Sequence, residues 1–248
     1  MRSRIYLDHA ATSWPKPESV YRTMDDYARE SGAPAGRGSY REAIEVERTI
    51  NQTRQAIAQL IEADDPRRIL FTYSGTDSLT LAIRGLVKPK DHVITTVCDH
   101  NSVLRPLHHL EQQQDVAVTR IGADAEGRIL PEDLAESIRP NTSLIAMVHA
   151  SNVTGALQPA DKVGEIARER GIPFLLDAAQ TLGHLPVSVR DFQCDLLAAP
   201  GHKGLLGPTG TGILYLSEEM SKRLTPIRMG GTGSQSERDE QPETLPDK

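Results

Sequence analysis

The sequence predicts an α/β fold, in which a mostly parallel sheet carries helices on both faces. Short apolar runs alternate with helical patterns from residue 69 onwards, and this alternation is typical of parallel sheets. Polar clusters follow the apolar runs, at the carboxyl ends of the expected strands, where sheets of this kind bind ligands. A chain of 248 residues suits one large domain or two modest ones and can bury a substantial core.

The individual elements follow from the spacing of the apolar residues. Residues 40–63 are charged and alanine-rich with Ile and Leu at helical spacing, which predicts one long amphipathic helix. The expected strands cover 69–72, 92–97, 116–119, 143–149 and 172–176, and the expected helices between them cover 77–87, 102–114, 131–138 and 159–170. The last apolar run, 211–217, follows a glycine-rich turn, and we expect it to pair antiparallel through a tight connection.

The two ends of the chain differ in composition from the middle. In residues 1–39, prolines and glycines leave room for only one short helix around 18–30, so this segment is predicted to form an arm. Residues 40–229 are predicted to form one large domain. In residues 230–248 only Leu245 is strongly apolar, and such a composition cannot fold by itself, which predicts a polar tail.

Composition argues against several classes of function. The 28 basic and 34 acidic residues give a net charge of -6, and no basic block suits nucleic acid. No run approaches the roughly 20 apolar residues of a membrane helix. The apolar stretch at the start of the chain is too short for a signal peptide, so we expect a soluble cytoplasmic chain. Cys98 and Cys194 form neither a disulfide framework nor a metal-ligand pattern, and we expect no metal site.

Two charged residues near apolar runs suggest a cofactor. Asp177 ends the run that begins at Ile172, and Lys203 lies in a later run rich in glycine. A lysine that forms a Schiff base and an acid that holds a pyridinium nitrogen make pyridoxal phosphate (PLP) an electron sink. A helix N-cap is the commoner role for an isolated Asp177, and a surface position is the commoner one for an isolated Lys203. Considered together, the two residues predict PLP.

Other strand ends carry polar residues that suit the same cofactor. The segment Ser74–Asp77 lies between a strand and a helix, where helix N–H groups bind anions, although ordinary capping explains it equally well. The flat ring of His100 suits stacking on an aromatic cofactor, and His202 suits donation to a phosphate oxygen. Asn152 and Gln180 suit hydrogen bonds to a ring oxygen. Each residue alone is typical of a turn, and their agreement favours a single site.

The segments that carry these residues also match known motifs, in order. They are Ile5–Thr12 (IYLDHAAT), Phe71–Asp77 (FTYSGTD), Asp99–Ser102 (DHNS), His149–Gly155 (HASNVTG), Leu176–Gln180 (LDAAQ) and Gly201–Pro208 (GHKGLLGP). Together they resemble the cysteine desulfurase branch of the class V aminotransferase family over essentially the whole chain. The ordered set is specific for fold type I PLP enzymes and less specific for the reaction.

The resemblance implies a PLP-binding large domain with a seven-stranded mixed sheet, and a role for each residue. It implies that Lys203 carries the cofactor, that Asp177 holds the pyridine nitrogen and that His100 stacks on the ring. It also implies that Asn152 and Gln180 contact the ring hydroxyl, that Gly75, Thr76 and His202 hold the phosphate, and that Arg37 lies near the active site. Members of the family are typically homodimers with active sites near the subunit interface.

Two departures from the family pattern affect these expectations. Many relatives have a hydroxyl residue where Pro200 stands, and proline offers neither a hydroxyl nor an N–H to a phosphate. Relatives also continue into a small domain with a Ser-Gly-Thr segment for the partner's phosphate, an arginine for the substrate carboxylate and a nucleophilic cysteine. Neither Cys98 nor Cys194 matches that cysteine. We therefore expect the tail 230–248 to lead toward a small domain that this chain lacks.

The predicted function is that of a PLP-dependent enzyme of cysteine desulfurase type. Such an enzyme releases sulfur from L-cysteine, leaves alanine and passes the sulfur to an acceptor protein. The alternative is a PLP-binding fragment or pseudoenzyme without turnover, because the arginine and cysteine of the small domain are missing. Selenocysteine lyase, aminotransferase and epimerase activities share most of the motifs and stay open.

Overall fold

The computed structural model describes residues 5–36 and 38–230. Arg37, which the resemblance assigns to the neighbourhood of the active site, lies outside the described residues, as does the predicted tail apart from Gly230. The proposed division into an arm, a large domain and a tail therefore stays a prediction. Among the described residues no helix is long and apolar enough to cross a membrane.

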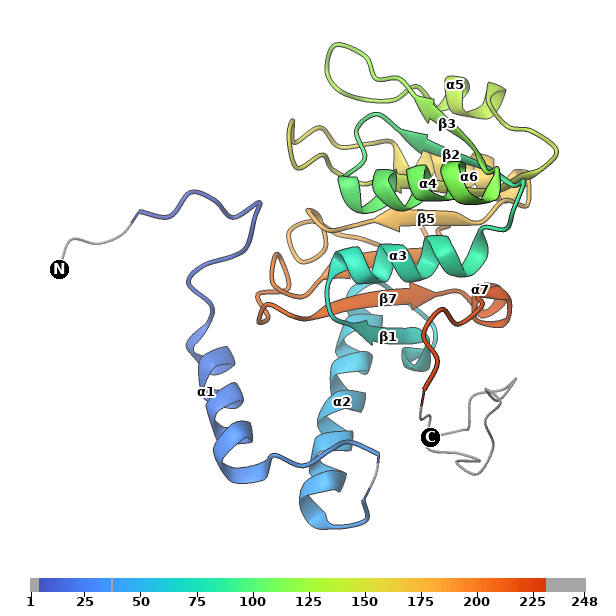
Figure 1. Ribbon diagram of the computed structural model, residues 1–248. Coiled ribbons are helices and arrows are strands. Elements are labelled where there is room, and N and C mark those ends of the chain that lie inside the picture. Colours follow the sequence, from blue (N-terminus) through green and yellow to red (C-terminus); the bar gives the residue numbers. More distant parts are fainter. Residues whose placement is uncertain (1–4, 37, 231–248) are drawn as a thin grey trace.

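Seven strands form a single mixed sheet in the order β1-β7-β6-β5-β4-β2-β3 (Figure 1). The strands are β1 (Ile69–Thr72), β2 (His92–Thr96), β3 (Ala117–Ile121), β4 (Thr142–Val148), β5 (Phe174–Asp177), β6 (Leu196–Pro200) and β7 (Gly212–Leu216). Neighbours from β3 to β6 pair in parallel, whereas β7 runs antiparallel to both β6 and β1. The antiparallel pairing expected for the last run is confirmed, and the sequence analysis had not delimited β6.

Helices alternate with strands from β1 to β5 as the periodicity predicts, whereas no helix separates β5, β6 and β7, all of which lie in the described part of the chain. The helices are α1 (Glu18–Asp26), α2 (Arg41–Leu60), α3 (Gly75–Leu86), α4 (Asn101–Gln114), α5 (Pro131–Glu136), α6 (Ala160–Glu169) and α7 (Glu218–Arg223), with a π-helical turn (Tyr27–Ser31) after α1 and a 3₁₀ turn (Pro66–Arg68) before β1. Helix α3 begins two residues before the predicted 77, because the Ser74 hydroxyl accepts from Asp77 N–H at 3.1 Å and so caps the first turn.

Two apolar layers fill the space between the sheet and its helices. On one face α3, α4 and α7 pack against side chains such as Leu144, Leu175 and Leu214. On the other face α2, α5 and α6 pack against side chains such as Ile145 and Phe174. Strands β2, β5, β6 and β7 are buried along their whole length, which is expected for strands covered on both sides. The predicted α/β architecture is confirmed.

The topology gathers the carboxyl ends of the parallel strands at one edge of the sheet. Strands β2, β4, β5 and β6 are consecutive parallel neighbours, so the residues that follow them come together. The residues that follow these four strands include His100, Asn152, Gln180 and Lys203. Helix α3 packs beside them, and its first turn faces the same edge. The fold therefore brings together residues that are far apart in the sequence.

Candidate active site

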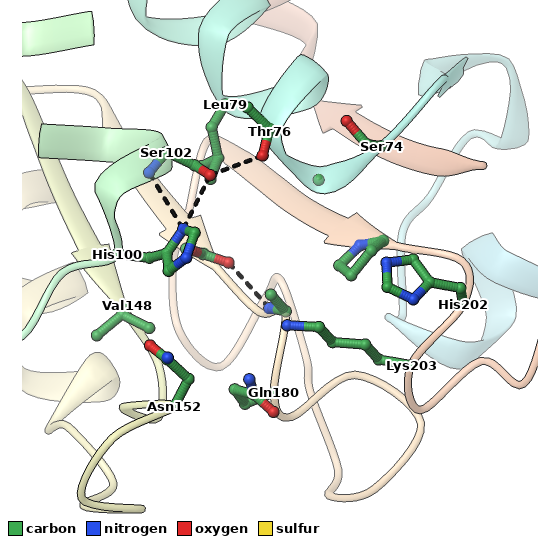
Figure 2. Close-up of a pocket in the computed structure, with 14 residues that line it drawn as sticks. Ser74, Thr76, Leu79, His100, Ser102, Val148, Asn152, Gln180, His202 and Lys203 are labelled. Carbon is green, nitrogen blue, oxygen red and sulfur yellow. Dashed lines mark hydrogen bonds between the residues drawn. The ribbon is translucent and has the colours of Figure 1, made fainter. Parts of the chain in front are cut away.

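A pocket lies at this edge of the sheet, with about 510 Å³ of space that opens to solvent. Every site residue that the sequence predicted, Arg37 apart, lines it: Gly75, Thr76, His100, Asn152, Asp177, Gln180, His202 and Lys203. Figure 2 shows the Lys203 side chain reaching into the pocket between His202 and Gln180, with Thr76 and Ser74 on the α3 side. The structure brings these residues to one place, while their individual roles stay predictions.

Asp177 is the most buried charged group of the pocket. Its residue is 2 % exposed, and burial raises the pKa of the carboxyl to about 6. Within the described residues its carboxylate accepts one hydrogen bond, from Ala179 N–H at 2.9 Å. A carboxylate has about four acceptor positions, so most of its capacity is unused by the protein. Lys203 is close enough to oppose the rise in the pKa by its positive charge.

Lys203 is half-buried, and this burial lowers the pKa of its amine. The nearby Asp177 carboxylate acts in the opposite direction and favours the charged amine. Two glycines let the loops that carry this pair approach each other: a Cβ at Gly183 would collide with the carbonyl of Gly204, and a Cβ at Gly204 would collide with that of Leu182. The glycines thus allow close packing of the two strand-end loops, which places the amine near the carboxylate.

The first turn of α3 forms the part of the pocket that suits an anion. Gly75 and Thr76 occupy the first helical positions, whose N–H groups have no carbonyl partner within a helix. Pro200 packs directly against this turn, and a Cβ at Gly75 would lie 3.1 Å from Pro200 Cδ. Glycine therefore lets the end of β6 come close to the helix. Pro200 lines the pocket but adds no donor to it, as the sequence analysis expected.

A chain of hydrogen bonds connects this turn with His100. Thr76 Oγ1 lies 2.7 Å from Ser102 Oγ, which lies 2.8 Å from His100 Nδ1 (Figure 2). Ser102 N–H also donates to His100 Nδ1 at 3.1 Å, so His100 is the N-cap of α4. Because Nδ1 accepts this N–H, the ring proton of a neutral His100 resides on Nε2. Partial burial and the cations Lys203 and Arg105 lower the pKa of His100 and so favour the neutral form.

The N-terminal segment contacts the loop that carries Lys203. Ser13 N–H donates to the carbonyl of His202 at 3.1 Å, and Lys16 Nζ donates to the same oxygen at 2.6 Å. Gln180 Nε2 donates to the carbonyl of Ala10 at 3.1 Å. The predicted arm is therefore anchored at the pocket over these residues, although α1, which follows, has no buried residue. The sequence analysis had assigned Gln180 only to the ring hydroxyl of the cofactor and had not predicted its bond to Ala10.

Sequence reasoning also missed two residues of the site. Ser102 lines the pocket and bonds both Thr76 and His100. A local signal for it exists, because Ser102 follows the expected end of a strand and stands at the expected start of the helix 102–114, where serine is common as a capping or turn residue. Thr12 lies 2.9 Å from the ring of His202, and the periodicity of the chain contains no signal for this long-range contact.

Comparisons with known proteins identify the family. A family model described as aminotransferase class-V matches residues 5–246. The chain belongs to the class-V aminotransferase family. A probable cysteine desulfurase of Methanothermobacter thermautotrophicus is 35 % identical over 232 residues, which cover 93 % of this chain and 57 % of that protein. The chain thus spans little more than half the length of this relative.

Solved structures of family members have the same fold. The apo structure of a cysteine desulfurase from Thermococcus onnurineus NA1 matches with a TM-score of 0.86 and 35 % identity, over 92 % of this chain and 57 % of that one. A structure of SspA in complex with cysteine matches with a TM-score of 0.85 and 35 % identity, over 91 % of this chain and 65 % of that one. The predicted resemblance to the cysteine desulfurase branch and the predicted fold type I are confirmed.

Proposed function

We propose that the pocket binds PLP and that the chain is the cofactor-binding part of a cysteine desulfurase-type enzyme, which converts L-cysteine to alanine. The observation that carries the proposal is the pairing of Asp177 and Lys203 in one pocket. The names of the relatives support the reaction, and the structure of SspA with cysteine supports the substrate. In the overall reaction the C–S bond of L-cysteine breaks, the sulfur joins the thiol of an acceptor, and alanine takes up a proton.

The residues of the pocket fit PLP. Asp177 is buried with only one hydrogen bond, and a protonated pyridine nitrogen would supply the cation and donor that its carboxylate lacks. The first turn of α3, with the Thr76 hydroxyl and His202 nearby, offers donors that suit a phosphate. Asn152 and Gln180 line the same pocket and suit the ring hydroxyl. When bound, PLP supplies an electron sink for the α-carbon of the amino acid.

Each residue then has a defined task. The lowered pKa of Lys203 increases the fraction of free amine, which is the form able to attach to an aldehyde. Asp177 would hold a bound pyridine nitrogen in its protonated form. His100 presents a flat neutral ring whose Nε2–H faces away from the Ser102 cap. We propose in addition a homodimer and a thiol acceptor, as the resemblance implies, and a cytoplasmic location, as the composition predicts.

The first test is covalent trapping of the cofactor. The purified chain is mixed with PLP and reduced with borohydride, and we expect the label on the peptide that contains Lys203. A label on another lysine, or no binding by a folded chain, would contradict the cofactor assignment.

The second test addresses the reaction. The PLP-loaded chain is incubated with L-cysteine and dithiothreitol, which reduces the transferred sulfur to sulfide, and alanine and sulfide are measured. Desulfuration by this chain would give the two products in equal amounts. PLP binding without alanine would leave the cofactor assignment standing and reject desulfuration by this chain. Faster turnover of L-selenocysteine than of L-cysteine would favour a selenocysteine lyase.

A further inference from the structure

The N-terminal segment bonds the ring of His202 as well as its carbonyl. Thr12 Oγ1 lies 2.9 Å from His202 Nδ1 and 3.0 Å from the His202 carbonyl oxygen. A hydroxyl carries one proton, so it can donate to only one of these two acceptors. If it donates to the carbonyl, it can only accept from a protonated Nδ1. If it donates to Nδ1, that nitrogen carries no proton.

The other donors around the carbonyl favour one of these arrangements. Ser13 N–H and Lys16 Nζ already donate to the His202 oxygen, at 3.1 Å and 2.6 Å, and a carbonyl oxygen has two lone pairs. The Ser13 hydroxyl accepts from Lys16 Nζ at 2.7 Å and lies 3.0 Å from both the His202 and the Lys203 carbonyl oxygens, so it can donate to either. These bonds satisfy both carbonyls without Thr12. Among the described residues, Nδ1 of His202 has no hydrogen-bond partner other than Thr12. The crowding of donors at the carbonyl therefore favours donation of the Thr12 proton to Nδ1.

The charges near the ring favour its neutral form. Partial burial lowers the pKa of His202, and the cations Lys203 and Lys16 lower it further. A neutral imidazole has a single N–H, and with Nδ1 as acceptor this proton must be on Nε2. No hydrogen bond within the described part of the chain involves Nε2, and the residue lines the pocket beside the first turn of α3.

We propose that Thr12 is a positioning residue, whose hydroxyl holds His202 in the Nε2–H tautomer and so aims a neutral donor at the phosphate of the ligand. The inference rests on the proposed function for the identity of the ligand, but its first part concerns the chain alone. The N-terminal segment would then determine which nitrogen of His202, the neighbour of Lys203 in the sequence, donates a hydrogen bond. Ser13 and Lys16 would contribute by occupying the carbonyl, which leaves the Thr12 proton to the ring.

The tautomer is measured directly by ¹⁵N NMR on chain labelled at histidine, with His202 assigned by its substitution with Gln. In the wild type we expect a pyrrole-type signal for Nε2 and a pyridine-type signal for Nδ1. Titration with inorganic phosphate should shift the Nε2 signal. In Thr12→Val the Nδ1 signal should move toward the pyrrole type as the other tautomer becomes populated, and Thr12→Ser should restore the wild-type pattern.

Ligand binding supplies the second readout. Thr12→Val should weaken PLP binding about fivefold, as expected for one lost hydrogen bond, while Thr12→Ser should bind like the wild type. Pyridoxal, which lacks the phosphate, should bind equally to all variants. The matched control is Thr53→Val, because Thr53 is exposed on α2 and, among the described residues, its hydroxyl bonds only the carbonyl of Thr49. Circular dichroism confirms that each variant is folded.

Each outcome bears on the proposal. A pyrrole-type Nδ1 or a doubly protonated ring in the wild type would overturn it, as would unchanged PLP affinity in Thr12→Val or an equal loss for pyridoxal. If the wild type bound no PLP and phosphate did not shift the Nε2 signal, both the proposed function and the proposed donation from His202 to phosphate would be rejected. The histidine spectra would still decide whether Thr12 sets the tautomer.

Discussion

Two buried carboxylates stand at the ends of two strands of this sheet, and their surroundings differ. Asp99 follows β2 and Asp177 ends β5, with β4 between the two strands. Their residues are 7 % and 2 % exposed, and burial raises the pKa of each carboxyl to about 6. Asp99 accepts from the hydroxyls of Thr95 and Thr96 and from the N–H groups of Thr96 and Val148, at 2.6–2.9 Å. Asp177 accepts from Ala179 N–H alone among the described residues.

The comparison shows that a raised pKa does not by itself identify a binding site. Asp99 is satisfied by the protein and joins the end of β2 to the end of β4, so its task is structural. Asp177 is also buried, but its carboxylate retains unused acceptor positions, and it lines the pocket close to Lys203. A buried polar group with few partners requires an explanation, and a cationic ligand group provides one. The predictions below test this distinction, in order of expected effect.

The largest effect is expected for Lys203, which has no counterpart at Asp99. Lys203→Met should abolish covalent trapping of PLP by borohydride, because no other lysine among the described residues lines the pocket. Lys162→Met, at an exposed lysine on α6, should trap PLP like the wild type. The measurement is the mass of the reduced chain. Full labelling of Lys203→Met would remove the reason for pairing Asp177 with this lysine.

The two carboxylates should respond in opposite ways to substitution by asparagine. Asp99→Asn should lower the free energy of unfolding by about 2 to 6 kcal/mol, because the new amide and at least one buried donor lose their partners. Asp177→Asn retains the acceptor for Ala179 N–H and removes a poorly compensated charge. Its unfolding free energy at pH 8 should equal or exceed that of the wild type, as measured by urea denaturation without cofactor.

Cofactor affinity should rank the same two variants in reverse. Asp177→Asn should weaken PLP binding roughly tenfold to a hundredfold, because a charge-assisted hydrogen bond is worth about 1.5 to 3 kcal/mol. Asp99→Asn, measured under conditions in which it is folded, should lose less. If Asp99→Asn lost more affinity than Asp177→Asn, the distinction between a structural and a ligand-binding carboxylate would be wrong.

The next effect is a dependence of stability on pH that both carboxylates should share. The folded-state pKa of Asp177 is about 6, above the usual 3.8, so the folded chain binds this proton more tightly than the unfolded chain. The stabilisation is complete below pH about 4 and is lost as the pH rises to about 6, by about 3 kcal/mol at most. The unfolding free energy of the wild type relative to Asp177→Asn should therefore fall across this window. A rise would show that the pKa is lowered instead.

Much of this site was predictable from the sequence, for identifiable reasons. Alternating patterns located most of the strands, and Asp177 and Lys203 stand out locally because one follows an apolar run and the other lies among glycines. The satisfied state of Asp99 was not predictable, because the bond from Val148 N–H depends on the pairing of β2 with β4. The contact of Thr12 with His202 joins residues 190 positions apart and leaves no trace in local periodicity. Order and pairing of strands are likewise non-local.

The smallest effect is the most direct test of the comparison. ¹³C NMR on chain labelled at the aspartate carboxyls should show Asp99 and Asp177 titrating near pH 6, with each signal assigned by its absence from the corresponding asparagine variant. PLP should lower the pKa of Asp177, because the carboxylate gains a cationic partner that favours its ionised form. Asp99 faces only protein donors, and Asp177 influences it less than burial and its own hydrogen bonds do, so its titration should hardly move. If PLP changed the pKa of Asp99 and not that of Asp177, the ligand would contact Asp99, and the proposed role of Asp177 would be wrong.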